Sequence, residues 1–443
     1  MTIARETAPA AALGPEHAEE PVAYDAIVLA SFGGPEGQDD VIPFLRNVTR
    51  GRGIPDARLE EVATHYRRHG GVSPINAQNR ALKAALEAEL ASRGIELPVH
   101  WGNRNWGPYL GDAVREAHAG GHRTLLAVAT SAYASYSSCR QYQEDLEAAL
   151  EETELAGEGR LDKVRPYFDH PGFVEPFVEG LRAALAELAG LGVDPGRTRV
   201  LFSTHSIPLA AAAASGPGLG PGGAYEAQHR TVAEVVMREA GAGIDWELVY
   251  QSRSGPPSQP WLEPDVNDVI RELPGRGVEA VVIVPLGFVS DHMEVIWDLD
   301  TEALATAGEV GVLARRTPTP GVHPAFVRGL VDLVLERVNG TPVAERPALT
   351  ALGPWYDVCR PGCCVAAPEG AARWAACGSA PAGARSRSRR RAPSPRASTP
   401  SSCPSRARAI ATARRWRSSA ARACSRRPSA RRSSRARSTP SCT

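Results

Sequence analysis

The stretch Ala280-Val-Val-Ile-Val-Pro-Leu286 carries the strongest strand signal in the chain, because it is a short apolar run dominated by β-branched residues. Similar runs at 199–203 and 246–251 precede it, and amphipathic stretches separate the runs. This alternation is typical of a parallel sheet whose faces are covered by helices. The helices expected in this series lie at 225–240, from about 292, and at 324–339, with a Gly-, Pro- and Ala-rich loop at 211–223.

The same alternation occupies the first part of the chain. We expect strands at 25–30, 99–102 and 124–130, and helices at 76–93, 109–119, 142–154 and 171–188. The predicted fold class is therefore α/β, with two Rossmann-like domains at 23–192 and 193–340, each a parallel sheet flanked by helices. In such sheets a ligand lies beyond the carboxyl ends of the strands, which here places the binding cleft between the two domains.

The net charge of zero is the sum of two unlike parts. The last acidic residue is Glu369, and the 19 Arg that follow it leave the body with 50 − 19 = 31 basic against 50 acidic residues. Residues 369–443 are too poor in apolar side chains to fold, so we predict a disordered tail, and likewise a disordered extension at 1–22. An Arg-rich nucleic-acid arm is one interpretation of the tail. We favour the other, a frameshifted end of a GC-rich gene, and expect no nucleic-acid partner.

The chain shows no signal for export or membrane insertion. Its first twenty residues mix charged residues with Ala and Pro and lack an apolar segment. No run reaches the roughly 18 apolar residues that a membrane span requires. We therefore expect a cytoplasmic protein, where disulfides are rare, with no stable membrane insertion. No apolar patch demands a partner, so we expect a monomer.

The segment Ser203-Thr-His-Ser-Ile-Pro208 places His205 just beyond an expected strand. A single histidine there is more often a hydrogen-bonded structural residue than a catalyst. Its context favours the catalytic interpretation, because acidic residues follow the strongest strand.

Glu294, Asp298 and Glu302 fall at i, i+4 and i+8 of a helix expected to begin at His292. A solvated helix face would show the same spacing. This row, however, begins at the carboxyl edge of a buried strand, so we expect its first member to line the cleft. Carboxylates along such a path can pass a divalent cation inward and take protons outward.

A third segment, 250–264, also follows an expected strand and combines turn residues with Arg253 and Trp261. A structural turn is one interpretation of it. The other is a cleft wall that offers one cation and one aromatic face.

Five segments in this order resemble ferrochelatases over about residues 24–340. They are Leu29-Ala-Ser-Phe-Gly-Gly-Pro35, Gly70-Gly-Val-Ser-Pro-Ile75, Phe202-Ser-Thr-His-Ser-Ile-Pro208, Gln251-Ser-Arg253 with Trp261-Leu262, and Gly287-Phe-Val-Ser-Asp-His-Met-Glu294. Each segment is short, but five in register are highly specific. The resemblance implies two Rossmann-like, chelatase-type domains with a porphyrin cleft between them.

By that resemblance His205 is the catalytic histidine and Glu294 its acidic partner, and we expect them on opposite walls of the cleft. Asp298 and Glu302 would continue an acidic path for iron. Inserting Fe²⁺ displaces two pyrrole protons, and an imidazole and a carboxylate suit accepting them or binding the metal, with the division left open. Phe32 stands where some bacterial relatives carry a ligating Tyr, and it can stack on the macrocycle but cannot ligate.

Arg46, Arg50 and Arg52 give the expected lip of the cleft a basic character, whereas this lip is apolar in membrane-associated relatives. A solvated turn is one interpretation. The other is a clamp for propionates, since Arg forks match carboxylates. Coproporphyrin has four propionates where protoporphyrin has two, so we favour coproporphyrin III as the partner of Fe²⁺. Phe32, Arg253 and Trp261 complete the expected substrate contacts.

Four cysteines, Cys139, Cys359, Cys363 and Cys364, lie outside the tail region. They lack a standard zinc spacing, but four thiolates are enough for a [2Fe–2S] cluster. The arrangement resembles that of cluster-bearing actinobacterial ferrochelatases, with three ligands in a C-terminal loop and one internal Cys. We therefore expect an iron–sulfur loop at 341–368, with a structural zinc as the alternative.

The sequence thus predicts an enzyme that inserts Fe²⁺ into coproporphyrin III to form coprohaem. Three alternatives stay open: a protoporphyrin IX ferrochelatase, a cobalt or nickel chelatase for sirohydrochlorin-type rings, and a porphyrin carrier without activity. A carrier would have no use for an acidic path behind the histidine.

Overall fold

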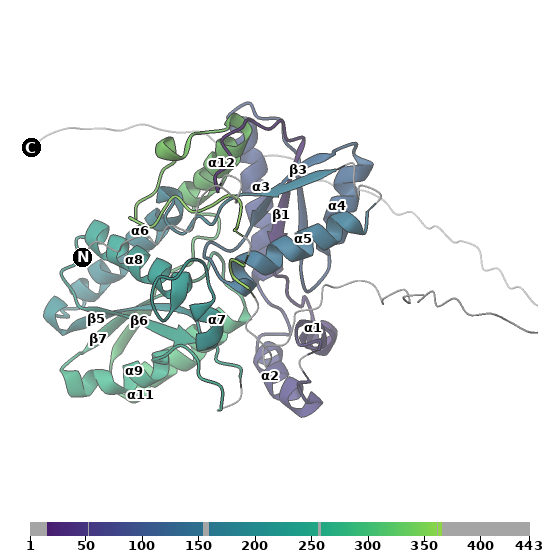
Figure 1. The fold of residues 1–443 in the computed structure, drawn as a ribbon. Helices are drawn as coiled ribbons and strands as arrows, with labels where there is room; N and C mark the ends of the chain where they lie inside the picture. Colours follow the sequence, from purple (N-terminus) through teal and green to yellow (C-terminus); the bar gives the residue numbers. More distant parts are fainter. Residues whose placement is uncertain (1–15, 52, 154–158, 256–257, 361, 366–443) are drawn as a thin grey trace, which may run out of the picture. The chain divides into compact units, whose positions relative to one another are not determined.

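Two four-stranded parallel sheets organise the computed structural model (Figure 1). Their strand orders, β2-β1-β3-β4 and β6-β5-β7-β8, repeat one doubly wound pattern. The predicted α/β fold with two Rossmann-like parallel sheets is confirmed. The strands are β1 (Ala26–Ser31), β2 (Val99–Asn103), β3 (Thr124–Ala129), β4 (Arg160–Lys163), β5 (Thr198–His205), β6 (Trp246–Gln251), β7 (Ala280–Val284) and β8 (Leu313–Arg316).

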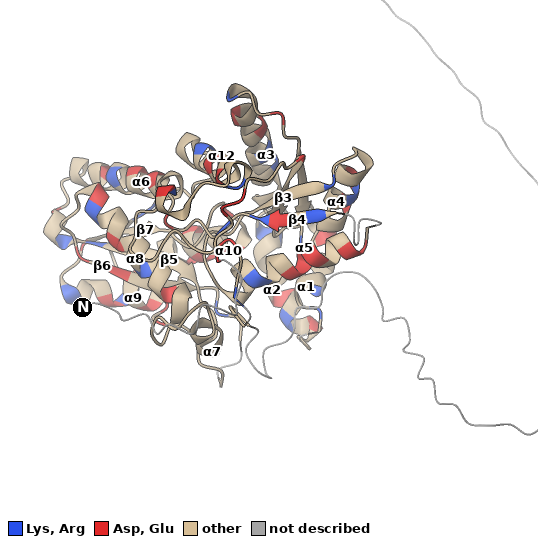
Figure 2. Ribbon diagram, turned by 45° about the horizontal axis from the view of Figure 1, so that its top comes forward, with Lys and Arg blue, Asp and Glu red and all other residues tan. Residues whose placement is uncertain are grey.

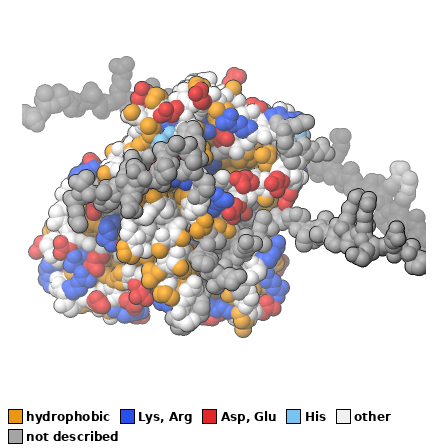
Figure 3. Space-filling model, in the orientation of Figure 1, with side chains coloured by type: hydrophobic (Ala, Val, Ile, Leu, Met, Phe, Trp, Pro, Cys, Tyr) orange, Lys and Arg blue, Asp and Glu red, His pale blue; other side chains and the backbone are white. Residues whose placement is uncertain are grey.

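The structure describes residues 16–51, 53–153, 159–255, 258–360 and 362–365. The predicted tail at 369–443 and most of the predicted extension at 1–22 lie outside these residues. Among the described residues, no helix is long and apolar enough to cross a bilayer. On the face shown in Figure 3, basic and acidic side chains are interspersed.

Helices connect the strands and cover both faces of each sheet (Figure 1). The α-helices are α1 (Val41–Val48), α2 (Asp56–Arg68), α3 (Ile75–Ser92), α4 (Leu110–Ala119), α5 (Gln141–Glu151), α6 (Pro171–Gly190), α7 (Leu209–Ala213), α8 (Gly223–Ala240), α9 (Val266–Glu272), α10 (Met293–Val295), α11 (Leu304–Glu309) and α12 (Pro324–Asn339). The other helical segments are the 3₁₀ turns η1 (Gln38–Asp40), η3 (Pro195–Arg197), η4 (Leu273–Arg276) and η6 (Val343–Glu345), and the π-helical segments η2 (Tyr136–Arg140) and η5 (Ile296–Ala303).

The side chains of each strand alternate between the two faces of its sheet. They form one central core and an outer core on the far face of each sheet. In β1, Ile27 and Leu29 join a central core, whereas Val28 and Ala30 face α4 and α5. In β5, Phe202 joins the same central core. The central core therefore lies between the two sheets, and each large side chain buried there contributes about 1.5–3 kcal/mol.

Two helices cross between the halves. Helix α6, which follows the first sheet in the chain, packs against α8 and β7, and α12, which follows the second sheet, packs against α3 and β3. Each half thus contributes one helix that packs against the other half. The domain limits 23–192 and 193–340 stay a prediction, because the central core contains side chains from both halves.

Several elements differ from the prediction. The edge strands β4 and β8 were missed because Arg160-Leu-Asp-Lys163 and Leu313-Ala-Arg-Arg316 are too polar to signal a strand. The helix expected from His292 begins as α10 and continues as the π-helical η5. The predicted loop at 211–223 overlaps the end of α7.

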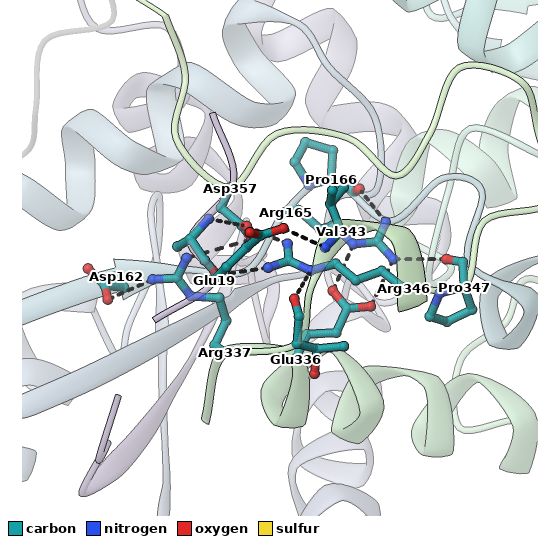
Figure 4. A network of polar contacts seen from close by, with 12 residues as sticks. Glu19, Asp162, Arg165, Pro166, Glu336, Arg337, Val343, Arg346, Pro347 and Asp357 are labelled. Carbon is teal, nitrogen blue, oxygen red and sulfur yellow. Dashed lines mark hydrogen bonds and ion pairs between the residues drawn. The ribbon is translucent and has the colours of Figure 1, made fainter. Parts of the chain in front are cut away.

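A buried ionic network fastens the segment after α12 to the first half (Figure 4). Arg165 is fully buried, and its guanidinium donates to both carboxylate oxygens of Glu336 at 2.8 and 3.0 Å. It also donates to the carbonyl of Pro347 at 3.0 Å and lies 3.3 Å from Asp169. Burial raises the pKa of Asp169 to about 6, against the opposing effect of Arg165.

Candidate active site

Three chain segments meet at the carboxyl end of the second sheet. His205 is the last residue of β5, which lies between β6 and β7. Gln251 ends β6 and is the register partner of His205, and Glu294 lies in α10, after β7. This is the switch point of a doubly wound sheet, where ligands bind in such folds.

The backbone sets the tautomer of His205. Its Nδ1 lies 2.5 Å from the carbonyl oxygen of Ser206, and a carbonyl can only accept, so Nδ1 carries the hydrogen. Nε2 lies 3.6 Å from Oε2 of Glu294, and the two side chains are 33% and 51% exposed. In its neutral form the ring therefore presents the Nε2 lone pair beside a carboxylate on a solvent-accessible side.

The sequence analysis predicted that His205 and Glu294 lie on opposite walls of a cleft, and this prediction is wrong. Both come from the second half, and their side chains are neighbours. The reason is topological: β5 and β7 are adjacent strands, so the segments that follow them converge at one edge. A flat ligand would lie over the pair instead of between its members.

Asp298 lies behind the pair, on η5. It accepts hydrogen bonds from the hydroxyl of Ser252 and, at 3.3 Å, from Nε2 of Gln251. Burial raises the pKa of Asp298 to about 7, aided by the charges of Glu294 and Glu302 and opposed by the Ser252 hydrogen bond. This carboxyl group can therefore gain or lose a proton near neutral pH.

The acidic row follows a π-helix. Glu294 lies just before η5 and Asp298 within it, while the exposed Glu302 accepts a hydrogen bond at 2.8 Å from Nε1 of Trp297. A π-helical turn is uncommon and often marks a functional site. The row runs from an exposed carboxylate through a half-buried one to the carboxylate beside His205.

Helix α2 of the first half covers this acidic row. The sequence analysis did not predict this helix. The ring of His65 stacks on Trp297, with centroids 4.0 Å apart and planes 6° apart. Tyr66 packs in one cluster with Phe44 and Met293, the residue before Glu294. Figure 2 shows α10 beside α1 and α2. Spacing of the apolar residues Leu59, Ala63 and Tyr66 at i, i+4 and i+7 is the signal that could have found this helix.

Phe32 borders the same cluster as a partly buried residue. It follows β1, so it reaches the site from the first half. Its ring offers an aromatic face and no oxygen that could bind a metal.

The remaining predicted substrate contacts do not form one group. Arg46 pairs with Asp56 at 3.0 Å, and both are exposed. The exposed Arg50 donates to Asn47 at 2.6 Å, and Arg52 lies outside the described residues.

The third predicted segment divides between surface and interior. Arg253 lies 3.4 Å from Glu263 on the surface. Trp261 is buried, and its Nε1 has no hydrogen-bond partner in the described part of the chain. A bridge between Trp261 and Pro208 ties this segment to the one that follows His205.

The four cysteines form a row of neighbouring thiols. Cys139, buried in η2, is hydrogen-bonded to Cys359, which contacts Cys363, and the sulfurs of Cys363 and Cys364 are 3.8 Å apart. The hydrogen bond that the Cys139 thiol donates to Cys359, and then burial, raise the pKa of Cys139. Over the residues that the structure describes, no three His, Cys, Asp or Glu side chains form a group that could hold a metal ion, so the row is not a closed coordination site.

Fold and site together define a two-sheet α/β protein with a histidine and carboxylates at a switch point. Residues 24–338 match the ferrochelatase family model, and the chain belongs to the ferrochelatase family.

Proteins similar to this chain include several coproporphyrin III ferrochelatases. The coproporphyrin III ferrochelatase of Leifsonia xyli subsp. xyli is 68% identical, over 80% of this chain and 95% of that protein. Those of Tropheryma whipplei strain Twist and Streptomyces griseus subsp. griseus are 58% and 55% identical, over 77% and 80% of this chain and 88% and 96% of theirs. Among solved structures, SirB from Bacillus subtilis with Fe³⁺ is 13% identical over 74% of this chain and all of that one, with a TM-score of 0.45.

Proposed function

We propose that this protein inserts Fe²⁺ into coproporphyrin III. The observation that carries the proposal is the His205–Glu294 pair, which presents an imidazole Nε2 and a carboxylate 3.6 Å apart at the switch point of the second sheet. Relatives that are 55–68% identical and named coproporphyrin III ferrochelatase support the choice of substrate.

The test is iron insertion without oxygen, with coproporphyrin III and protoporphyrin IX compared as substrates. We expect a higher kcat/KM for coproporphyrin III. Preference for protoporphyrin IX would overturn the choice of substrate. Faster insertion of cobalt or nickel into sirohydrochlorin would overturn the reaction, and tight porphyrin binding without turnover would favour a carrier.

The site residues divide the reaction between them. Each metal ion that enters the ring releases two pyrrole protons; the Nε2 lone pair of His205 would accept one, and the other would leave through the carboxylates of the acidic row. Glu294, with Asp298 and Glu302 behind it, offers oxygen ligands to the incoming Fe²⁺, and carboxylates combine with imidazole as ligands in non-haem Fe²⁺ sites. Asp298 can also exchange protons, because its pKa of about 7 is close to neutral pH.

Replacing Asp298 by asparagine is expected to stabilise the protein at high pH and to slow iron insertion. The pKa of Asp298 rises from 3.8 to about 7 on folding, so the folded state holds the proton more tightly and stability falls as pH rises through that window. The asparagine side chain does not ionise, so it avoids this loss of stability. A pKa shift of about three units corresponds to a loss of at most about 4 kcal/mol.

Urea unfolding of Asp298→Asn at pH 4 and pH 8 checks this. The gain over wild type should be present at pH 8 and absent at pH 4, and iron insertion should fall about tenfold because a carboxylate on the path is lost. Glu309→Gln, at the exposed end of α11, is the control and should follow the wild-type pH curve of stability. Parallel curves for Asp298→Asn and wild type would contradict the argument.

We further propose that Arg46, Arg50 and Arg52 bind propionates at the rim, with Phe32 and Trp261 against the macrocycle and Arg253 beside them. The exposed pairs of Arg46 with Asp56 and Arg50 with Asn47 support this, because such contacts are weak and exchange readily for a substrate carboxylate. In the described part of the chain, Nε1 of the buried Trp261 has no hydrogen-bond partner, and Trp261 is bridged to Pro208 in the segment that follows His205.

Cys139, Cys359, Cys363 and Cys364 are proposed as the ligands of a [2Fe–2S] cluster. The residues fit in kind and in number: four free thiols lie in one row, three of them with a raised pKa, although the described side chains do not form a closed metal-binding group. Crowded thiols resist ionisation, and a bound cation reverses that resistance. When bound, the cluster would link the C-terminal loop covalently to the first half.

Replacing Cys359 by serine is expected to abolish the visible absorption of the protein purified without oxygen. The wild type should contain about two iron and two sulfide ions per chain, and the variant almost none. Cys403→Ser is the control, because that cysteine lies outside the proposed ligand set. A wild-type protein that holds zinc and shows no visible absorption would overturn the cluster.

A further inference from the structure

A buried polar path joins the first half to the strand that carries His205, through helix α8. The ring of Tyr133, from the first half, stacks on His229 of α8 with centroids 3.6 Å apart and planes 14° apart. The Tyr133 hydroxyl donates to the carbonyl of Leu286 at 3.0 Å. Next to it, Oε1 of Gln228 accepts from the backbone N–H of Ala134 at 2.8 Å.

The other side of α8 reaches the backbone of His205. Nε2 of His229 lies 2.9 Å from Oγ1 of Thr204, and this hydroxyl lies 2.8 Å from the hydroxyl of Tyr225. The Tyr225 hydroxyl in turn donates to the carbonyl of His205 at 2.9 Å. Thr204, Tyr225 and His229 are all buried.

These buried groups share few donor hydrogens, so each hydrogen bond constrains the next. Nδ1 of His229 lies 2.7 Å from the carbonyl of Tyr225 and must donate to it. Burial lowers the pKa of His229 to about 3, so the ring is neutral and its Nε2 accepts. The single hydrogen of Thr204 then serves either His229 or Tyr225, while the hydrogen of Tyr225 is committed to His205.

The Tyr225 hydroxyl shares the task of holding the backbone at His205 with Ser206, whose N–H donates to the carbonyl of Gln251 at 2.8 Å. The His205 carbonyl belongs to the peptide plane that leads to Ser206, and the Ser206 carbonyl accepts from Nδ1 of the His205 ring. Tyr225 is itself held in place, because its backbone N–H donates to Oγ of Ser215 at 2.9 Å. Holding the His205 carbonyl therefore helps to position the next carbonyl, that of Ser206, which orients the catalytic ring.

We propose that Tyr225, backed by Thr204 and His229, is a positioning residue for iron insertion. It holds the His205 backbone, and through it the imidazole, in the orientation that presents Nε2 beside Glu294. The inference rests on the proposed function of His205. The contact of His229 with Tyr133 ties this orientation to the first half, which supplies the helices that cover the site.

Tyr225→Phe tests the proposal, since it removes the hydroxyl and keeps the ring. We expect kcat for iron insertion to fall about tenfold while KM for coproporphyrin III stays within about twofold. The matched control is Tyr167→Phe, which removes another buried hydroxyl that donates to a backbone carbonyl, that of Ala129 at 2.7 Å. The control should lose stability without the loss in kcat.

A spectroscopic reading separates positioning from general destabilisation. In ¹⁵N-labelled protein, the Nδ1–H signal of His205 should broaden or shift in Tyr225→Phe and stay in place in Tyr167→Phe. Thr204→Ser, which keeps a hydroxyl, should retain both the signal and kcat. Wild-type kcat in Tyr225→Phe beside an inactive His205→Ala would overturn this inference alone. Activity in His205→Ala would overturn the proposed function and this inference together.

Discussion

Replacing His205 by alanine is expected to lower kcat for iron insertion by about 10²- to 10⁴-fold, the range typical of a lost general base. The substitution removes the Nε2 lone pair beside Glu294. The affinity for coproporphyrin III should stay within about tenfold of wild type, because a macrocycle is held over a broad surface. Fluorescence quenching on porphyrin binding and single-turnover metallation measure the two quantities separately.

A second histidine–glutamate pair provides the control. Nε2 of His323 lies 3.1 Å from Glu179, and the two side chains are 29% and 54% exposed, closely like those of the proposed site. His323 caps α12 by accepting from the N–H of Ala325, so its pair is structural. His323→Ala should cost some stability and leave kcat unchanged. If both variants lost activity equally, or if His205→Ala kept it, the assignment of His205 would be wrong.

Pairs of this kind show what residue patterns can and cannot predict. The strands at β5, β6 and β7 were predictable because they are apolar runs, and the position of His205 at a strand end followed from them. Its closeness to Glu294 required the order β6-β5-β7-β8, which places β7 next to β5. No local pattern encodes that order.

Long-range packing explains the other differences. The acidic spacing of Glu294, Asp298 and Glu302 was visible, but the cover that α2 provides depends on a stack between His65 and Trp297, residues more than 200 positions apart. That Arg46 pairs with Asp56 depends on α1 and α2 lying side by side. Sequence patterns report the face of a helix and not the partner that meets it.

The buried network around Arg165 was also invisible in the sequence, and it supports the largest expected change in stability. Glu336→Gln keeps the size of the side chain and removes the charge that two of the three guanidinium nitrogens of Arg165 contact. Arg165 is fully buried and cannot turn to water. Leaving a buried charge without its main partner costs about 3–5 kcal/mol of the free energy of unfolding, moderated here by the nearby Asp169.

The matched control lies one turn earlier on the same helix. Asp332 pairs with Arg93 at 2.6 Å but is 45% exposed, so Asp332→Asn makes the same acid-to-amide change in water. An exposed pair of this kind contributes about 0.2–1 kcal/mol. Urea unfolding at pH 7.5 gives both values, and equal losses would show that Arg165 finds compensation elsewhere.

The same substitution should reach the cysteine loop. Arg165 also holds the carbonyl of Pro347, and the segment after α12 continues to Arg346 and its buried partner Asp357, just before Cys359. A loosened Arg165 weakens the anchor of that segment, so limited proteolysis should cut Glu336→Gln between 341 and 358 at a urea concentration where Asp332→Asn stays intact. Cleavage at the same urea concentration in both variants would mean that Asp357 and Arg346 hold the segment without help from Arg165.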